Sequence, residues 1–424
     1  MCDCNLSFSS TSSVDAGSYK FLELPPELAT LIESSISSLS TSSSSQHDGN
    51  YAGLKIKGVH GEDAVLCTAD KTYSMRSVVL SNSVLVVTQP PAPTRSGSPS
   101  ATDGIHGEAT VDPSDTVVIR DTLNEIIELA PTVPKLYKLN ALLRGKEYTD
   151  SSVDEDVVST RETADGHGEK DWFSYKDALS QIQASDGELE KGLKDRRILI
   201  VNGYLRPITP SFLTHILELA LNLMVSLSLT PSRAPVHEIA STLADEDEIP
   251  LSVTHQIMAW FGEVNLREDK WAADVKLIVR EIGLGLLREH GLGSGIENDA
   301  FLEKWKTAVS DKFEDLVEME LLSVRILISY PLGNVLLSAS TLSAYGDDTT
   351  TTLQYFPASQ LPADPPARFA ELFLTRTRWR TDDITPFLSD IAVNTKDRDR
   401  LLLKYARAVN DKDGLWYTAR AQYT

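Results

Sequence analysis

The end of the chain, residues 365–424, contains three short helical patterns and then a strand pattern, and this order restricts the possible fold more than any other part of the sequence. Two of the helices show apolar residues at the i, i+3, i+4, i+7 spacing of a helix that packs one face on a core. These residues are Phe369, Leu372 and Phe373 in the first helix, where the basic Arg376 ends the stripe at i+7, and Ile384, Phe387, Leu388 and Ile391 in the second. Pro386 fits a first turn if Asp382 or Asp383 is the N-cap, because a first-turn residue has no intrahelical bond to lose.

The third helical pattern, which opens at Lys396-Asp397, has an apolar face and a basic face. The apolar face consists of Leu401, Leu402, Tyr405, Ala408 and Val409, and the basic row opposite it of Arg400, Lys404 and Arg407. A strand pattern around Trp416 follows Gly414. Three short helices and a strand are typical of a winged helix, a variant of the helix-turn-helix. The sequence therefore predicts a winged helix with a cationic recognition helix.

Four runs of this sequence resemble the Dcc family, the sister chromatid cohesion subunit of an alternative replication clamp loader. Near the C-terminus they are RWRTDDITPFLSDI at 378–391 and LLKYAR at 402–407; upstream they are LCTADKTY at 66–73, together with Ser81-Asn82, and Tyr204-Leu205-Arg206. The resemblance implies a non-catalytic adaptor. It also implies an N-terminal module that interlocks with the large and small cohesion-specific clamp-loader subunits.

The first part of the chain, residues 18–130, contains six or seven short β-rich runs separated by turn residues. They are Tyr19–Leu24, Leu54–Val59, Ala64–Thr68, Thr72–Val79, Val84–Thr88, Thr116–Arg120 and Glu125–Leu129, with Ser81-Asn82 expected as a turn. So few strands are barely enough to close a barrel, and an open sheet leaves edges that a partner can pair with. We expect an antiparallel, barrel-like module that needs foreign strands.

Helical patterns dominate after residue 130, and their order repeats. Helices followed by a hairpin, Ile198–Val201 and Tyr204–Pro207 around Asn202-Gly203, suggest one winged-helix unit. The predicted fold is α+β, with a barrel-like β module followed by tandem, mostly helical winged-helix units. The expected boundaries are 18–130, then 131–208 with an acidic insert at 147–170, then 209–272, 273–356 and 357–424.

Charge is distributed unevenly along the chain. The whole chain carries a net charge of −21, yet from Arg376 to the end there are ten Lys or Arg and seven Asp. Phosphate contacts require local positive potential, so only this end is suited to DNA. The candidate DNA-binding residues are Arg376, Arg378, Arg380, Lys396, Arg400, Lys404, Arg407 and Arg420. The alternative interpretation is a solvated face of an acidic protein, interleaved with Asp382, Asp397 and Asp399.

Partner contacts are expected on the N-terminal module. The candidates, carried by the LCTADKTY run and by the following strand, are Leu66, Thr68, Asp70, Lys71, Tyr73, Val84 and Val86. Trp379 and Trp416 could stack on a base, but core or interface packing is the more frequent role of such residues. The other tryptophans, at 172, 260, 271 and 305, receive the same interpretation.

Catalytic and metal sites are not predicted. The glycine-rich run 291–295 lacks the Gly-Lys-Ser/Thr ending of a phosphate-binding loop, and we interpret it as a connector. The three cysteines, Cys2, Cys4 and Cys67, cannot make a zinc site by themselves, and Cys67 is expected to be an ordinary strand residue. No cofactor is expected. No apolar run approaches the roughly 20 residues of a membrane span, and the start lacks the features of a secretory signal.

The leading hypothesis is an accessory subunit that links the clamp loader to DNA and to the leading-strand DNA polymerase epsilon. The resemblance implies a nuclear protein that acts on the sliding clamp indirectly and supports sister chromatid cohesion. A different class of protein, a free-standing winged-helix transcription regulator, remains open at this point. That alternative requires a self-sufficient N-terminal domain.

Overall fold

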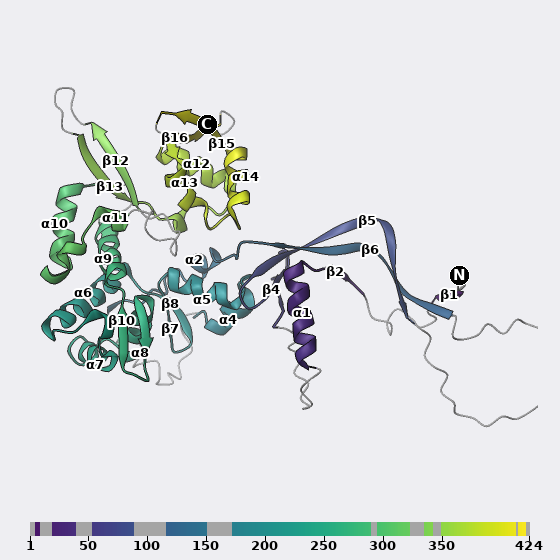
Figure 1. Cartoon of the computed structure of the whole chain (residues 1–424), viewed down its shortest axis with the longest axis horizontal. Helices are drawn as coiled ribbons and strands as arrows, with labels where there is room; N and C mark the ends of the chain where they lie inside the picture. The colour runs from purple at the N-terminus through teal and green to yellow at the C-terminus, as the bar shows by residue number, and fades with distance from the viewer. Residues whose placement is uncertain are drawn as a thin grey trace, which may run out of the picture. The chain divides into compact units, whose positions relative to one another are not determined.

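The computed structural model describes residues 5–8, 19–39, 53–88, 116–150, 172–289, 295–322, 335–341, 349–412 and 414–420 (Figure 1). The fold is a mixed α+β fold, as predicted. Its contacts divide it into two compact units. The first unit is Met1–Thr68 with Thr72–Thr132, and the second is Ala69–Lys71 with Val133–Thr424.

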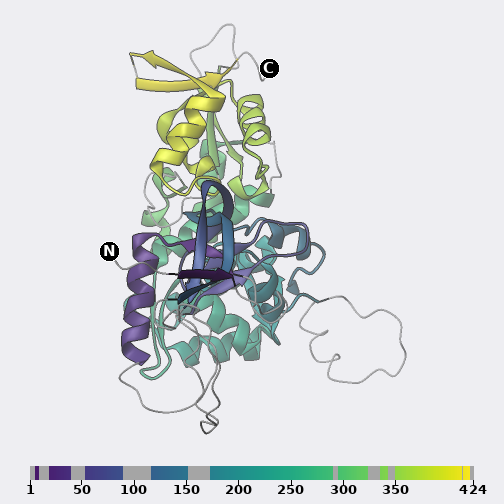
Figure 2. The ribbon, with the colours of Figure 1, turned by 90° about the vertical axis from the view of Figure 1, so that its right-hand side faces the viewer.

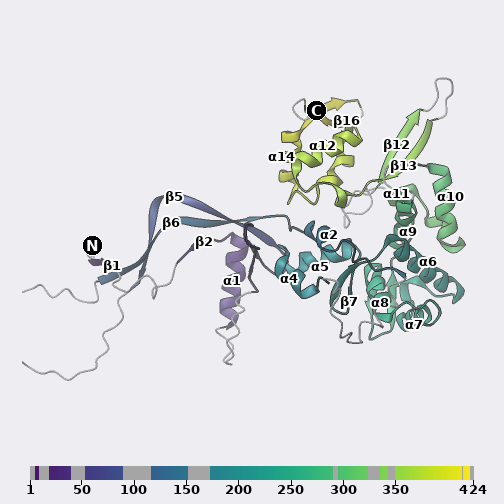
Figure 3. The ribbon, with the colours of Figure 1, turned by 180° about the vertical axis from the view of Figure 1, so that it is seen from behind.

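Two long antiparallel strands, β5 (Thr72–Thr88) and β6 (Thr116–Pro131), form the first unit's main feature and run together as a ribbon (Figure 3). The shorter strands are β1 (Asn5–Phe8), β2 (Phe21–Glu23), β3 (Lys55–Lys57) and β4 (Val65–Cys67). The order is β1-β6-β5-β4-β3, and β2 also pairs with β6. This path does not return on itself, so the described strands form an open sheet and no closed barrel.

The prediction of separate strands on either side of a turn at Ser81-Asn82 was wrong, because β5 continues through it. Two register shifts, between Val79 and Val84 and between Val86 and Val87, absorb the irregularity and let the strand continue. Side-chain pairs also join β5 to β6. They are Ser77 Oγ to Glu125 at 2.7 Å, Ser83 Oγ to Asn124 at 2.8 Å, and Arg120 Nε to Thr88 Oγ1 at 2.9 Å.

The core of the first unit is small and lies at one end of the ribbon. Leu28 of α1 (Pro26–Leu39) packs with Leu66 and Tyr73, and Leu24, Leu54, Met75 and Leu129 surround them. Cys67 is buried in β4, as expected. Beyond Met75, no described apolar side chain of β5 is buried. A two-stranded ribbon without a core is marginally stable by itself.

The second unit begins with α2 (Lys138–Leu142), α4 (Tyr175–Gln181) and α5 (Asp186–Asp195), followed by the hairpin β7 (Ile198–Val201) and β8 (Tyr204–Pro207). The predicted hairpin is confirmed, with positive φ at Asn202 and Gly203. A capping box begins α5, since the Ser185 hydroxyl accepts from the Glu188 N–H. The helix expected from residue 131 begins only at Lys138.

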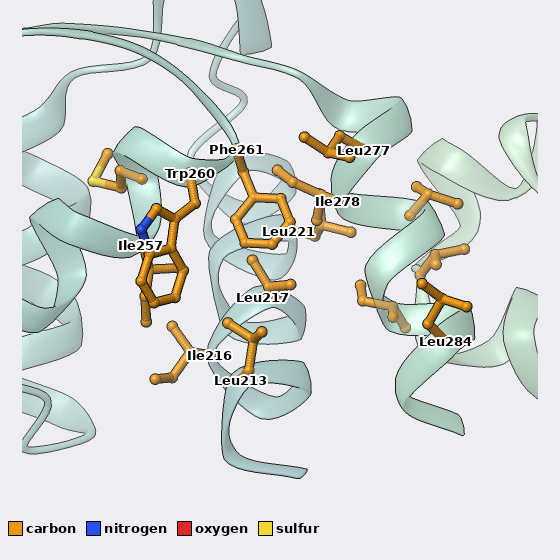
Figure 4. Close-up of a cluster of buried hydrophobic side chains, with 14 of the residues drawn as sticks. Leu213, Ile216, Leu217, Leu221, Ile257, Trp260, Phe261, Leu277, Ile278 and Leu284 are labelled. Carbon is orange, nitrogen blue, oxygen red and sulfur yellow. The ribbon is translucent and has the colours of Figure 1, made fainter. Parts of the chain in front are cut away.

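The largest hydrophobic core is formed mainly by the helices and strands that come after β8 in the chain (Figure 4). Its helices are α6 (Pro210–Ser226), η3 (Pro231–Arg233), α7 (Val236–Glu246), α8 (Leu251–Trp260), α9 (Val275–Glu289), α10 (Asn298–Ala308), η4 (Asp311–Leu316) and α11 (Met319–Leu322). Its strands are β9 (Gly262–Asn265), β10 (Lys270–Ala273), β11 (Ile296–Glu297), β12 (Val335–Thr341) and β13 (Thr349–Tyr355). Trp260, Trp271 and Trp305 are buried in it, which confirms their predicted packing role. Most of the glycine-rich run 291–295 lies outside the described residues.

The C-terminal group begins with η5 (Ala358–Gln360) and contains α12 (Pro365–Thr375), α13 (Thr381–Ile384), η6 (Thr385–Leu388) and α14 (Thr395–Tyr405). Its three-stranded sheet has the order β14 (Arg378–Arg380), β16 (Gly414–Ala419), β15 (Ala406–Asp411). Figure 2 shows β15 and β16 as a hairpin that extends beyond the helices. Trp379 is fully buried in this group's core with Phe369 and Leu372.

Two expectations for this group were wrong. The third helix ends at Tyr405, and Ala408 and Val409 lie on β15, where Ala408 is exposed. Pro386 lies in the first turn of the separate 3-10 helix η6, so neither Asp382 nor Asp383 acts as its N-cap. The physical reason for the shorter helix is the sheet: residues 406–411 pair with β16.

Candidate partner and nucleic-acid surfaces

The ribbon of β5 and β6 presents a backbone edge that is open to another strand. β4 pairs with β5 only at Thr72–Ser74, and no described strand pairs with the same edge from Met75 to Thr88. Exposed apolar side chains lie along this stretch: Val79 is 74% exposed, Leu85 44% and Val87 46%. An unpaired edge with apolar side chains is a template for strand addition.

The predicted partner residues fall into three environments. Leu66, Thr68 and Tyr73 are buried within the first unit. Asp70 and Lys71 are exposed in the turn Ala69–Lys71, which groups with the second unit and whose Ala69 carbonyl accepts from the Gly187 N–H at 2.9 Å. Val84 and Val86 are half-buried on the open ribbon.

The prediction missed the exposed Val79, Leu85 and Val87 beside these two valines. The signal was present in the sequence as the apolar runs on both sides of Ser81-Asn82, but the expected turn hid their continuity. The ribbon is therefore a part of the first unit where an unpaired strand edge and exposed apolar side chains occur together.

Eight basic residues near the C-terminus were predicted to contact DNA, and all lie in one group of elements. Lys396, Arg400 and Lys404 lie on α14, whereas Arg407 lies on β15. The prediction that Arg400, Lys404 and Arg407 form a row on one helix was therefore wrong. Arg400 Nη1 pairs with Asp397 at 3.2 Å, and Lys404 Nζ lies 5.0 Å from the centre of the Tyr405 ring.

The remaining four residues surround the three-stranded sheet. Arg376, at the end of α12, lies 3.7 Å from Asp383 and stacks over Trp379 at 5.1 Å. Burial lowers the pKa of the Arg376 guanidinium, and the nearby Asp383 carboxylate offsets part of this decrease. Arg420 follows β16 and donates from Nε to the Ala406 carbonyl at 3.2 Å. These contacts fix two guanidiniums close to the protein.

Arg378 and Arg380 share one face of β14 because side chains alternate along a strand. Both stack on Trp416 of β16, with distances to the ring centre of 4.3 Å and 5.0 Å. Trp379, between them in sequence, points into the core. The sequence did not predict this stack, because Trp416 lies far from Arg378 and Arg380 along the chain.

Asp411, at the end of β15, accepts a hydrogen bond from Arg378 Nη2 at 2.6 Å. A second hydrogen bond comes from the Lys412 N–H at 2.7 Å. The bond from Arg378, followed by that from Lys412, lowers the pKa of the Asp411 carboxyl. Asp411 is therefore an anion that is already bound to one of the candidate DNA-binding arginines.

A cluster of charged side chains is buried in the large core, unlike the exposed basic residues of the C-terminal group. Glu281 of α9 accepts from Arg197 Nη2 and from Arg288 Nη1, both at 2.9 Å. Burial acts to raise the pKa of the Glu281 carboxyl. The two guanidiniums act in the opposite direction and outweigh it, so the pKa falls to about 2. Arg288 Nε also donates to the Tyr355 hydroxyl at 3.0 Å, and Arg197 lies over the Phe261 ring at 4.5 Å. Since every member is paired inside the core, we interpret this cluster as structural.

The described residues contain neither a membrane-spanning helix nor a cluster of metal ligands. None of the described helices has the length and apolar character needed to span a membrane. Within the same residues, His, Cys, Asp and Glu form no group of three or more that could hold a metal ion.

Comparison with known proteins gives a consistent result. The family profile described as Sister chromatid cohesion protein Dcc1 matches residues 19–388. The chain is 26% identical over 400 residues to the sister chromatid cohesion protein DCC1 of Danio rerio, covering 93% of this chain and 88% of that protein. The protein of the same name from Saccharomyces cerevisiae is 22% identical over 423 residues, covering 92% of this chain and 93% of the yeast protein. The family match ends at Leu388, before α14.

Proposed function

The chain belongs to the Dcc1 family of sister chromatid cohesion proteins, and from this premise we propose that it is a non-catalytic accessory subunit of an alternative replication clamp loader. It links that clamp loader to DNA and to the leading-strand polymerase epsilon, and it acts in the nucleus on the sliding clamp indirectly. The comparisons give no support to a free-standing transcription regulator.

The open ribbon is the observation that carries this proposal. A self-sufficient domain would cover its strand edges and apolar side chains, whereas β5 leaves an edge unpaired among the described strands and Val79 largely exposed. Strands from the large and small cohesion-specific subunits would pair with this edge and cover the apolar side chains. The first unit is thus the assembly module, and its partners complete the barrel that it does not close.

Purification of the tagged full-length chain from cells tests the assembly. We expect mass spectrometry to find both cohesion-specific clamp-loader subunits in amounts comparable to the chain, because covering the ribbon requires them. A preparation that contains the chain alone, or a transcription complex in their place, would contradict the proposal.

We further infer that the second unit is a series of winged-helix units that reach toward the polymerase and DNA. In four places helices are followed by an antiparallel pair of consecutive strands: β7–β8, β9–β10, β12–β13 and β15–β16. The order α12, β14, α13, α14, β15, β16 matches the arrangement of a winged helix, with β15–β16 as the wing. We propose the boundaries 131–208, 209–272, 273–356 and 357–424 for these units.

We propose that DNA contacts the C-terminal unit through α14 and the sheet beside it. Three candidates, Lys396, Arg400 and Lys404, are exposed on α14, the helix that would follow the groove. The carboxylates paired with Arg376, Arg378 and Arg400 weaken the positive potential, so we expect modest affinity without sequence selectivity.

Changing Arg400 and Lys404 together to Gln should weaken duplex binding by the full-length chain about tenfold or more at low salt. The slope of log affinity against log salt should flatten by about 2 units, because each lost phosphate contact removes ~0.9. Fluorescence anisotropy with a labelled duplex measures both quantities. A Lys304→Gln, Lys306→Gln variant on α10 is the matched control. Equal affinity and slope for all three proteins would remove α14 from the proposed contact surface.

A further inference from the structure

The side chain of Arg378 is held by two contacts of different kinds. Its guanidinium stacks on the Trp416 ring at 4.3 Å, and its Nη2 donates to Asp411 at 2.6 Å. Stacking on an aromatic face fixes the plane of a guanidinium without neutralising its charge. Trp416 therefore orients Arg378, while Asp411 supplies the negative charge.

The hydrogen bonding of this cluster is incomplete. Arg378 Nε and Trp416 Nε1 are enclosed by neighbouring side chains, and neither has a hydrogen-bond partner in the described part of the chain. Asp411 engages Arg378 through one nitrogen, whereas an arginine binds a carboxylate or phosphate best through two parallel hydrogen bonds. The guanidinium is therefore held by Asp411 through a single hydrogen bond, and its hydrogen bonding is not saturated.

The pair is also accessible enough to be exchanged. The side chains of Arg378 and Asp411 are 39% and 46% exposed, and ion pairs at this degree of exposure contribute little to stability. Asp411 lies at the end of β15, beside the turn that joins it to β16. A phosphate group can therefore replace the carboxylate without disrupting the core, of which neither side chain is a member.

We propose that Asp411 is an internal competitor for a DNA phosphate at Arg378 and thereby holds down the affinity of the C-terminal unit for DNA. This inference rests on the proposed DNA contact and adds its regulation. The phosphate accepts from Nη2 in place of Asp411. The released carboxylate returns to water, and Trp416 keeps the guanidinium in position throughout.

Competition from Asp411 makes the contact between Arg378 and a DNA phosphate weak and readily reversible. Each encounter with DNA must displace a carboxylate before Arg378 can contribute, so the wing engages a phosphate backbone weakly and releases it readily. The same arrangement recurs at Arg400, which pairs with Asp397 at 3.2 Å. Asp411 differs because Trp416 also orients the arginine to which Asp411 is bound. Removing the Asp411 charge is therefore expected to leave a guanidinium that is already positioned to bind a phosphate.

The test is duplex binding by full-length Asp411→Asn. Asparagine keeps an oxygen that accepts from Lys412 N–H but removes the charge that competes with phosphate. We expect affinity to rise about 3- to 10-fold at ~0.1 M salt, and the salt slope to steepen by about 0.9, the value for one additional phosphate contact. Thermal unfolding should be unchanged, because the Asp411 side chain lies at the surface.

Two matched variants separate the specific effect from a general change in charge. Glu371→Gln, at an exposed position of α12, changes the net charge equally and should leave the slope unaltered. In an Arg378→Gln background, Asp411→Asn should give no more than the gain seen with Glu371→Gln, since the arginine through which it acts is gone.

The outcomes distinguish the inference from the function on which it rests. If the unaltered chain binds no DNA at low salt and Asp411→Asn binds none either, both the proposed DNA contact and this inference fail. If the unaltered chain binds but Asp411→Asn has the same affinity and slope, the inference alone is overturned. A gain that persists in the Arg378→Gln background would also overturn it.

Discussion

Replacing Glu281 by Ala is expected to lower the free energy of unfolding by about 3–5 kcal/mol, the usual cost of removing one partner of a buried ion pair. The carboxylate lies between Arg197 and Arg288, each at 2.9 Å, and its side chain is only 4% exposed. Without it, two guanidiniums remain in the core without their shared counter-charge. Denaturant unfolding of the full-length chain, followed by circular dichroism, measures the change.

The matched control and the pH dependence make this prediction specific. Glu289→Gln, exposed on the same helix, should change stability by less than about 0.5 kcal/mol. The pKa of Glu281 falls from an ordinary value of 4.5 to about 2, so its contribution is present above pH 4.5 and is lost as the pH falls toward 2. The Ala variant should lack that part of the acid destabilisation. Equal stability of the two variants would contradict the account of this cluster.

The second large effect is expected from Val79→Asp combined with Leu85→Asp. Both side chains lie exposed on the open ribbon, so the charges should leave the folded chain stable while preventing another subunit from covering them. We expect the two clamp-loader subunits to bind at least about 100-fold more weakly, because each buried unpaired carboxylate costs several kcal/mol and 1.4 kcal/mol is a factor of ten. Quantitative pulldown with the tagged chain measures the loss.

The control for this experiment lies on the same strand. Ser81→Asp with Asn82→Asp adds the same charge at two exposed polar positions between the apolar runs. It should reduce assembly less than the Val79 and Leu85 changes do. Normal recovery of both subunits by Val79→Asp, Leu85→Asp would show that the apolar side chains of the ribbon are not part of the interface.

Local patterns predicted much of the helical part of the fold. The hairpin around Asn202-Gly203 and the burial of Trp379 were both predicted from residues close in sequence. Such features depend on backbone preferences and on one-sided apolar spacing, which a sequence displays directly. Strands whose pairing is set at long range were harder to place. β14 and β15 were missed, because three residues at 378–380 become a strand only by pairing with β16.

For the candidate surfaces too, features set by nearby residues were predicted and contacts between distant residues were not. Composition located the basic residues at the C-terminus, but it could not reveal that Arg378 and Arg380 share the Trp416 ring or that Asp411 occupies Arg378. These contacts join residues more than thirty positions apart. In the first unit, Leu66 and Tyr73 were expected at an interface. They are core residues instead, because both pack against Leu28 of α1. The long ribbon was not predicted because Ser81-Asn82 was interpreted as a turn, whereas two register shifts let β5 continue through it.

Hydrogen–deuterium exchange, compared between the full-length chain alone and the chain bound to the two clamp-loader subunits, tests most directly whether the first unit is an unfinished sheet. The account predicts rapid exchange in the free chain for those β5 amides from Met75 to Thr88 that point away from β6, because no described strand pairs with that edge. It predicts strong protection of the same amides in the complex. Equal protection in both states, with the changes confined to the helical unit, would contradict it.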